Sequence, residues 1–347
     1  MSVRPRLLAL ETAVPPYTLN QKDVAVRAAN LFRGRKDIDR LLPVFENTGI
    51  EQRYSCVPID WYTEPHGWKD RNELYIEHSL ALFEKITEDC LKAAKLKRED
   101  IGAIVVSSTT GIATPSLDAL LVERMGLRRD IVRLPIFGLG CAGSVLGMAR
   151  AASLAQSMPG TNVLFLVVEL CALTFRKDDV SKSNIVATAL FGDGAAGAIL
   201  STEGDGPEIG ATGEYTWANS LDIMGWEIEE DGLKARFLTS IPGLVARDFR
   251  KIAGEFARKN DIDLKDIDAF ACHPGGAKVL DALEDALSLE RGALEDSRAT
   301  LRDYGNMSAA TAMFVLKRMN DSGKRERRMM TALGPGFSCG FVMLEGR

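Results

Sequence analysis

Short apolar runs alternate with longer amphipathic stretches along most of this chain. The runs end in Gly, Pro, Ser or charged residues, which is typical of strands buried in a sheet. They predict strands over Ala103–Ser107, Ile131–Phe137, Val163–Glu169, Ala195–Ser201, Ala269–His273, Met329–Leu333 and Ser338–Glu345. Apolar positions at helical spacing predict helices over Leu74–Lys95, Ser116–Met125, Ser144–Ser157, Pro242–Lys259, Ala277–Leu287 and Ala309–Asn320. Strands that alternate with helices indicate an α/β fold.

A weak internal repeat divides this pattern into two halves. Two pairs of segments carry the similarity: Glu99–Val106 with Leu264–Ala271, and Leu190–Ile199 with Leu333–Val342. Between these markers, the turn into a helix around Cys141 corresponds to the turn into a helix around Asn306. We therefore expect two packed halves of one βα pattern, residues 1–205 and 206–347.

Composition narrows the classes of function. The chain has 347 residues, 46% of them hydrophobic, which is enough for one large or two medium cores. A net charge of −5 gives no basic field for nucleic acid. No uncharged apolar stretch reaches the roughly 18–20 residues that a membrane span needs, and the start of the chain lacks the apolar core of a secretory signal. The six cysteines are widely spread with no C-x-x-C, which argues against a metal knuckle or a disulfide scaffold and favours a reduced, cytoplasmic compartment.

Cys141 stands at the junction of a predicted strand and a predicted helix. The apolar run ends at Phe137, glycines follow, and an Ala-rich helical segment begins directly after the cysteine. Unpaired N–H groups and the dipole at a helix N-terminus favour the thiolate, the nucleophilic form of cysteine. The position therefore favours covalent catalysis. An inert core cysteine is the alternative, because free cysteine is among the most buried residue types.

The same segment also permits a different interpretation. Gly138, Gly140 and Gly143 spell G-x-G-x-x-G between a strand and a helix, which is a dinucleotide-binding pattern. Glu169 could supply the acidic residue that this pattern requires after the next strand. The unit lies in the middle of the chain, however, and a cysteine inside the pyrophosphate turn has no role in it. Nicotinamide or flavin binding is thus the weaker alternative.

Two further polar residues lie where α/β proteins place their chemistry. His273 ends a predicted strand and is followed by Pro-Gly-Gly, and Asn306 precedes a helix of small residues. A histidine that caps a carbonyl and an asparagine that serves only as an N-cap are the alternatives. If the two halves bring equivalent loops face to face, Cys141, His273 and Asn306 converge.

Five short motifs, in this order, resemble the type III polyketide synthases, the chalcone synthase-like branch of the thiolase fold. They are Gly140–Gly143, Leu190–Gly194, Cys272–Gly276, Gly305–Ser308 and Gly334–Phe337. The resemblance extends from about Leu7 to Leu344 and implies a layered α/β/α/β/α arrangement of two thiolase-like halves. Ketoacyl-carrier-protein synthase III enzymes share the Cys-His-Asn chemistry, but their histidine is typically followed by Gln-Ala-Asn.

The resemblance implies a site and its substrates. It implies a catalytic Cys-His-Asn set of Cys141, His273 and Asn306, and substrate-binding positions at Phe191, Thr109, Cys171, Thr174, Trp226, Ala235 and Ser308. Phe191 is similar to the family's gatekeeper ring at the mouth of the coenzyme A tunnel. Acyl-CoA and malonyl-CoA are the implied substrates, with no metal or redox cofactor. A homodimer is also implied, in which Thr114 takes the place of a residue that reaches the neighbouring site.

The chemistry of these residues suits decarboxylative condensation. His273, as imidazolium, is expected to lower the pKa of Cys141 and to hold an ion pair ready for attack on a thioester. His273 and the Asn306 amide are then expected to stabilise the enolate that malonyl-CoA leaves on losing carbon dioxide. Two alternatives remain: a carrier-protein-dependent condensing enzyme of fatty acid synthesis, and an inactive scaffold of the same fold.

Departures from the plant pattern bear on the starter. Ala235 stands where a second gatekeeper phenylalanine is expected, Trp226 replaces a glycine, and basic residues for the CoA phosphates are mostly missing around residues 40–47. The pattern is closer to bacterial alkylpyrone and alkylresorcinol synthases. We therefore expect medium to long fatty acyl-CoA starters with the tail beside Ala235, although the bulk of Trp226 could close that space.

Overall fold

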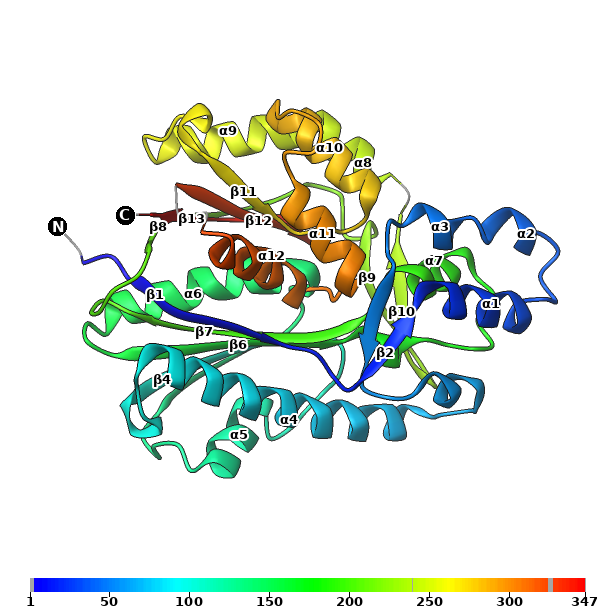
Figure 1. The fold of residues 1–347 in the computed structure, drawn as a ribbon, viewed down its shortest axis with the longest axis horizontal. Helices are drawn as coiled ribbons and strands as arrows, with labels where there is room; N and C mark the ends of the chain where they lie inside the picture. Colours follow the sequence, from blue (N-terminus) through cyan, green and yellow to red (C-terminus); the bar gives the residue numbers. More distant parts are fainter. Residues whose placement is uncertain (1–2, 239, 324–326, 347) are drawn as a thin grey trace.

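The computed structural model describes residues 3–238, 240–323 and 327–346. Helices and strands alternate along the chain and stack in five layers (Figure 1). Helices form the two outer layers and the middle layer, and strands form the two layers between them. The predicted α/β class and layered arrangement are confirmed.

Nine strands of the described chain form one mixed sheet. Its order is β11-β12-β13-β8-β1-β7-β6-β4-β5. The bounds are β1 Arg6–Ala13, β4 Ile101–Ser107, β5 Val132–Ile136, β6 Asn162–Leu170, β7 Asp193–Ser201, β8 Glu208–Thr216, β11 Ala269–Cys272, β12 Arg328–Gly334 and β13 Ser338–Glu345. The two strand layers meet where β1 and β8 share one register pair, Arg6 with Glu208.

The strand order is the same on both sides of this seam. In the second half, β8-β13-β12-β11 repeats the order β1-β7-β6-β4 of the first half, and β5 is an additional edge strand. Helix α6 (Gly143–Ser157) precedes β6, and helix α12 (Ala310–Asp321) precedes β12 at the equivalent point. The paired sequence segments thus include equivalent strands: β4 with β11, and β7 with β13.

The middle layer, α6 and α12, is buried against strands on both sides. Small residues make this possible, since a helix between two sheets has no solvent face to carry long polar side chains. At Gly147 of α6, an added Cβ would lie 2.6 Å from the ring of Phe165 on β6. Apolar side chains of both strand layers join the two helices in one core cluster.

The outer helices are amphipathic. Helices α4 (Trp68–Ala94) and α5 (Leu117–Met125) cover one strand layer (Figure 1). Helices α8 (Ile241–Leu244), α9 (Arg250–Lys259) and α10 (Ala277–Leu287) cover the other, with the π-helical turn Val245–Phe249 between α8 and α9. Helix α4 begins earlier than the hydrophobic pattern predicts, because its first turn is polar.

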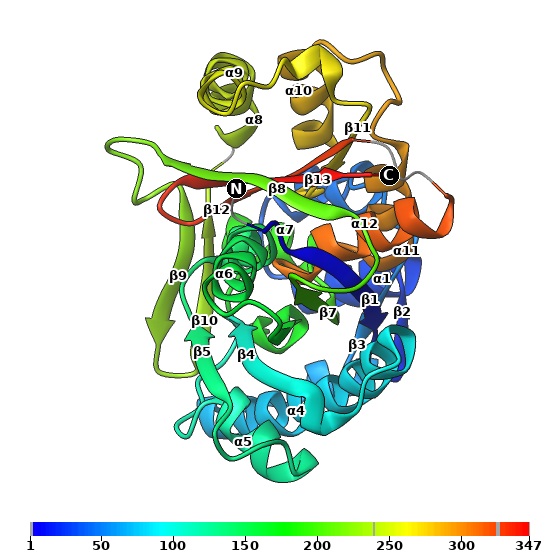
Figure 2. The ribbon, with the colours of Figure 1, turned by 90° about the vertical axis from the view of Figure 1, so that its left-hand side faces the viewer.

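The remaining elements were not predicted from the sequence, because they are short, largely polar or interrupted by polar residues. They are β2 Tyr17–Asn20, α1 Gln21–Leu31, α2 Ile38–Leu41, α3 Val44–Asn47, β3 Gln52–Ser55, α7 Lys182–Leu190, β9 Met224–Glu229, β10 Gly232–Phe237 and α11 Glu295–Tyr304, together with β1 and β8. Short 3-10 turns are Ile59–Thr63, Arg98–Asp100, Gly140–Ala142, Cys171–Thr174 and Leu264–Asp266. Helices α1, α2, α3 and α7 cluster at one end of the layers, and the β9–β10 hairpin passes beside the middle layer (Figure 2). Within the described ranges, no helix combines the length and the hydropathy needed to cross a bilayer.

Candidate active site

Cys141 lies in the 3-10 turn Gly140–Ala142, immediately before α6. The turn requires glycine at position 140, where φ is +46° and an added Cβ would lie 2.6 Å from Pro335. Cys141 is 8% exposed, and its thiol donates a hydrogen bond to Ser308 Oγ over 3.6 Å. The strand-to-helix position that the sequence predicts for Cys141 is confirmed.

His273 and Asn306 reach the same place from two other loops. His273 follows β11, and its backbone N–H donates to the carbonyl of Thr331 on β12 over 2.8 Å. Asn306 lies between α11 and α12, where its Nδ2 donates to the carbonyl of Gly275 over 3.3 Å and its Oδ1 accepts from the N–H of Ser308 over 2.8 Å. The Asn306 backbone is bonded to the segment around Phe191, through the carbonyl of Leu190 and the N–H of Gly192.

One cavity brings these side chains together, and we call it the first cavity. It has an empty volume of about 790 Å³, part of it open to solvent. Seven of the predicted site residues line it: Cys141, His273, Asn306, Phe191, Trp226, Ala235 and Ser308. The other lining residues are mainly apolar, and Arg236 supplies a cation at the wall.

Burial governs the charges in the first cavity. It raises the pKa of Cys141 to about 12, an effect to which the nearby Glu169 contributes and which the bond to Ser308 opposes. It lowers the pKa of His273 to about 3. Neither ring nitrogen of His273 has a hydrogen-bond partner among the described residues. Desolvation thus favours the neutral forms of both groups in the free protein and opposes the thiolate–imidazolium pair that the sequence predicts.

Glu169 is a site residue that the sequence analysis assigned to another role. It is fully buried at the end of β6, and its two carboxylate oxygens accept from the backbone N–H of Thr109 over 3.0 Å and from its hydroxyl over 3.1 Å. Burial raises the pKa of Glu169 to about 7, against hydrogen bonds from the Thr109 backbone, Thr110 and Ser308. Ser308 thus connects the Glu169 carboxyl with the Cys141 thiol.

Thr109 links this carboxyl to the turn that carries the nucleophile. Its hydroxyl accepts from the N–H of Gly140 over 3.1 Å. Thr109 does not line the first cavity and instead lies behind Cys141. Its position indicates a role in holding the turn, whereas the resemblance implies a lining position. One signal in the sequence could have found this network: an acidic residue, Glu169, that directly follows the apolar run Val163–Val168 of a buried strand.

Cys171 and Thr174 are also outside the first cavity. They line a separate cavity, which we call the second cavity, between α1, α7 and the turns Ile59–Thr63 and Cys171–Thr174. Phe191 is the one predicted site residue that lines both cavities. The fold therefore distributes the predicted substrate positions other than Thr109 over two cavities, and the Phe191 ring lies in the wall of both.

Aromatic side chains close the first cavity around Phe191. The ring of Trp226 lies 6.0 Å from that of Phe191, and the ring of Phe237 lies 6.2 Å away in an edge-on arrangement. Ala235 of β10 pairs in register with Trp226 of β9, so the indole stands beside the space that the small residue opens. Phe237 was not predicted as a site residue, although it is two residues beyond Ala235 on the same face of β10.

The region around residues 40–47 offers few contacts for CoA phosphates. Arg40 is exposed, and its guanidinium is 3.2 Å from Asp37 in an exposed ion pair. This agrees with the shortage of basic residues seen in the sequence. In the described chain, no group of three or more His, Cys, Asp or Glu side chains is arranged to hold a metal ion.

The dinucleotide interpretation of the glycine motif is wrong. Gly140 and Gly143 serve close packing, because a Cβ at Gly143 would lie 2.6 Å from Ser107 Oγ. Glu169 is fully buried, and both of its carboxylate oxygens accept hydrogen bonds from Thr109, so it cannot reach a ribose.

Comparisons with known proteins agree along the whole chain. Residues 3–204 match the N-terminal domain of chalcone and stilbene synthases, and residues 214–346 match their C-terminal domain. A putative chalcone synthase of Bacillus subtilis (strain 168) is 37% identical, with 98% of each chain covered. A 1,3,6,8-tetrahydroxynaphthalene synthase of Streptomyces peucetius subsp. caesius is 36% identical, with 97% of this chain and 92% of that one covered. The solved 1,3,6,8-tetrahydroxynaphthalene synthase of Streptomyces coelicolor A3(2), a bacterial type III polyketide synthase, has a TM-score of 0.95 at 27% identity and covers 99% of each chain.

Proposed function

Because the chain belongs to the chalcone and stilbene synthase family and is a type III polyketide synthase, we propose that Cys141, His273 and Asn306 carry its reaction. The enzyme is a decarboxylating, condensing acyltransferase that uses CoA thioesters. One observation supports the residue assignment above all others. Loops after β5, β11 and α11 bring these three side chains to a single cavity.

The first step loads the starter on Cys141. The sulfur attacks the thioester carbonyl of an acyl-CoA while an unpaired ring nitrogen of His273 takes the thiol proton. The bond from the acyl carbon to the CoA sulfur then breaks, and CoA leaves as the thiol with the proton that His273 carried. Neither ring nitrogen of His273 has a partner among the described residues, so the acceptor nitrogen is free to receive the proton as the transfer proceeds.

The second step extends the chain. Malonyl-CoA loses its carboxylate as carbon dioxide, and the electron pair moves into an enolate. One Asn306 amide hydrogen is bonded to Gly275, and the other is available to donate to the enolate oxygen together with His273. Such donors contribute on the order of 3–4 kcal/mol each in favourable cases. The enolate carbon attacks the acyl thioester, a carbon–carbon bond forms, and Cys141 leaves as the thiolate.

We further propose medium to long fatty acyl-CoA starters and an alkylpyrone or alkylresorcinol product. The apolar lining of both cavities supports this choice, because a saturated tail gains about 0.8 kcal/mol for each buried methylene. A carrier-protein-dependent condensing enzyme and an inactive scaffold remain as alternatives.

A homodimer is part of the proposal. Strand β5 is an edge strand that pairs only with β4 among the described strands, and Val132 and Leu134 on it are more than a third exposed. Phe137 beyond its end is 63% exposed, and Ile112 on the neighbouring loop is 46% exposed. An apolar unpaired edge is a template for a second strand, so a second copy of this chain is the occupant that we propose. Thr114 is exposed next to this surface and is the residue proposed to reach the partner's site.

The proposal also covers the boundary between the two halves and the cellular compartment. We place the division between the halves at residues 205 and 206, which the repeated strand order supports. We also place the protein in a reducing, cytoplasmic compartment, in keeping with six cysteines that all lie in the described chain as free thiols.

The proposal is tested by incubation with radiolabelled malonyl-CoA and a panel of starters: acetyl-, malonyl-, coumaroyl- and saturated acyl-CoA thioesters of increasing length. We expect labelled polyketide from free CoA thioesters and acylation of Cys141 in the intact-protein mass spectrum. Activity with acyl-carrier-protein substrates alone would support the fatty acid alternative. Absence of both acylation and product with every starter would support the scaffold.

A further inference from the structure

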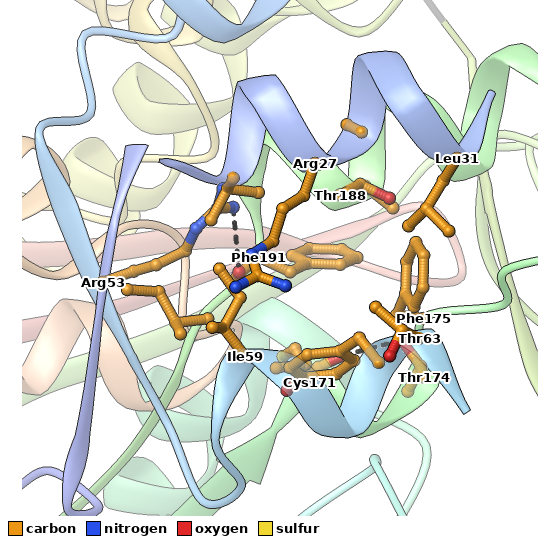
Figure 3. Close-up of a pocket in the computed structure, with 16 residues that line it drawn as sticks. Arg27, Leu31, Arg53, Ile59, Thr63, Cys171, Thr174, Phe175, Thr188 and Phe191 are labelled. Atoms are coloured by element: carbon orange, nitrogen blue, oxygen red, sulfur yellow. Dashed lines mark hydrogen bonds between the residues drawn. The ribbon is translucent and has the colours of Figure 1, made fainter. Parts of the chain in front are cut away.

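Arg53 is among the largest fully buried side chains of the described chain, and the reaction described above gives it no role. It lies on β3, in the wall of the second cavity next to Phe191 (Figure 3). The residue is 1% exposed, and burial lowers the pKa of its guanidinium to about 10, so it is still a cation at neutral pH. Because burying a cation costs free energy, the groups that it contacts indicate what it serves.

The guanidinium of Arg53 is held by two uncharged oxygens. Its Nη2 donates to Gln21 Oε1 over 2.6 Å, and its Nη1 donates to the carbonyl of Phe191 over 3.1 Å, the dashed line beside Phe191 in Figure 3. Gln21 is itself buried, and its Nε2 donates to the carbonyls of Phe45 and Ala189 over 3.0 Å each. Arg53 therefore has a fixed anchor on one side and the main chain of Phe191 on the other.

The main chain around Phe191 is paired with that of Asn306. The N–H of Asn306 donates to the carbonyl of Leu190 over 2.9 Å, and the N–H of Gly192 donates to the carbonyl of Asn306 over 3.0 Å. Phe191 and Asn306 thereby form a parallel bridge. A hydrogen bond that fixes the Phe191 carbonyl thus also fixes the strand-like segment on which Asn306 depends.

Two glycines of the sequence motifs let the Arg53 side chain lie against both segments. Gly192 belongs to the motif Leu190–Gly194, and Gly305 belongs to the motif Gly305–Ser308. An added Cβ at Gly192 would lie 3.0 Å from Arg53 Cβ, and one at Gly305 would lie 3.2 Å from the same atom. Each half of the chain therefore lacks a side chain at the point where Arg53 passes it.

We propose that Arg53 is a positioning residue for the amide of Asn306. Its guanidinium holds the Phe191 carbonyl and so fixes the paired main chains that place this amide in the first cavity. The inference rests on the proposed function and deepens it, because Arg53 then serves the step assigned to Asn306, the decarboxylation of malonyl-CoA. Lysine is a poor replacement, since its single nitrogen does not reproduce the two diverging donors of the guanidinium.

The first test compares two fully buried arginines. Arg328 on β12 donates from Nη1 to Asn320 Oδ1 over 2.6 Å and lines neither cavity, so Arg328→Lys is the matched control. Carbon dioxide release from malonyl-CoA and acylation of Cys141 by acetyl-CoA are measured, both per molecule that can be acylated. Arg53→Lys is expected to slow carbon dioxide release about tenfold and acylation less than about threefold, because a small displacement of a catalytic group has a large effect on its own step. Arg328→Lys should keep the wild-type ratio of the two rates.

Three outcomes of this test would overturn the inference. They are equal losses of both rates in Arg53→Lys, no loss of either rate, and a loss of acylation itself. In the first and third cases Arg53 would serve the fold as a whole, and in the second it would serve neither step.

The second test asks whether Arg53 acts through the amide. Once Asn306 is alanine, Arg53→Lys is expected to slow the remaining carbon dioxide release less than about twofold, because the group that it positions is gone. The same tenfold loss in both backgrounds would show that Arg53 acts independently of the amide and would overturn the inference. Wild-type carbon dioxide release in Asn306→Ala alone would instead overturn the proposed function, so the two failures are distinguishable.

Discussion

The two cavities on either side of Phe191 share a wall but differ in which polar groups they leave without a hydrogen-bond partner. In the first cavity, both ring nitrogens of the buried His273 lack partners among the described residues, and Cys141 has only a long contact to Ser308. In the second cavity, hydroxyls and cations are bonded to neighbouring side chains or carbonyls, with Arg53 Nε as the exception.

The unpartnered groups of the first cavity suit a reaction, whereas the partnered groups of the second cavity suit contact with apolar atoms. An unpaired buried donor or acceptor costs free energy, so a protein keeps one where a substrate or transition state will use it. A cavity for hydrocarbon needs the reverse, because any free polar group would have to lose its water without gaining a partner. The experiments below test this comparison, beginning with the largest expected effect.

Cys141→Ala should abolish chain extension, with a loss of more than about a thousandfold, because no other cysteine opens on the first cavity. Product formation from labelled malonyl-CoA measures it. Cys90→Ala is the matched control, since Cys90 lies on the buried face of α4 and lines neither cavity. Comparable losses in the two variants would show that the effect is structural.

The two polar partners of Cys141 should separate the steps. Asn306→Ala is expected to slow malonyl-CoA decarboxylation about a hundredfold and to affect acyl loading much less, because its amide is assigned to the enolate oxygen. His273→Ala should impair both steps, since the imidazole takes the thiol proton and faces the enolate. Carbon dioxide release and Cys141 acylation are measured separately. An equal loss of loading in both variants would contradict this division.

Alkylation of the cysteines should report the neutral state of the free site. Iodoacetamide is expected to modify Cys141 first, because it is 8% exposed whereas the other five cysteines are at most 1% exposed. Since burial raises the pKa of Cys141 to about 12, the rate should rise about tenfold per pH unit between pH 7 and pH 10. Peptide mass spectrometry gives the site and the rate. A rate that levels off near pH 7 would restore the ion pair that the sequence predicts.

Glu169 should make stability depend on pH. Its pKa in the folded protein is raised to about 7 from 4.5, so the neutral form fits the fold, and its contribution is complete below about pH 4.5 and is lost as the pH rises through 7. This loss amounts to about 3 kcal/mol. Glu169→Gln should therefore flatten the fall in the free energy of unfolding between pH 4.5 and 8, as measured with urea. Curves that run parallel in variant and wild type would mean that Glu169 is ionised throughout.

The smallest expected effect is at Ala235. Because Trp226 already stands beside it, Ala235→Phe should change the ratio of dodecanoyl to acetyl loading by less than about threefold. The ratio of kcat/KM for acylation of Cys141 by the two thioesters measures it. A shift of tenfold or more would place the tail beside Ala235, as the sequence predicts.

Much of this architecture could be predicted from the sequence, and the limits have physical causes. Regular alternation of apolar runs and helical stretches located β4 to β7 and α4 to α6, and the repeat paired the turns of Cys141 and Asn306. Strands β1 and β8 were missed because charged residues, Gly and Thr interrupt their apolar pattern. Sequence places Cys141 at a helix start, which favours a thiolate, but it does not give the depth of burial that reverses the pKa shift. The sequence likewise indicates Cys171 and Thr174 as substrate positions, but it does not predict that they line a different cavity from Cys141.

The main chain on both sides of Phe191 is hydrogen bonded to the main chain of Asn306. Its neighbours Leu190 and Gly192 are hydrogen bonded to the backbone of Asn306, and its own carbonyl accepts from Arg53. The backbone at this position therefore cannot shift without moving the catalytic amide, whereas the ring can turn about its side-chain torsions. In evolutionary terms this makes residue 191 a place where substrate range can change by a single exchange of side chain. An ancestral enzyme could change the wall between the two cavities while the chemistry at Asn306 stayed in place.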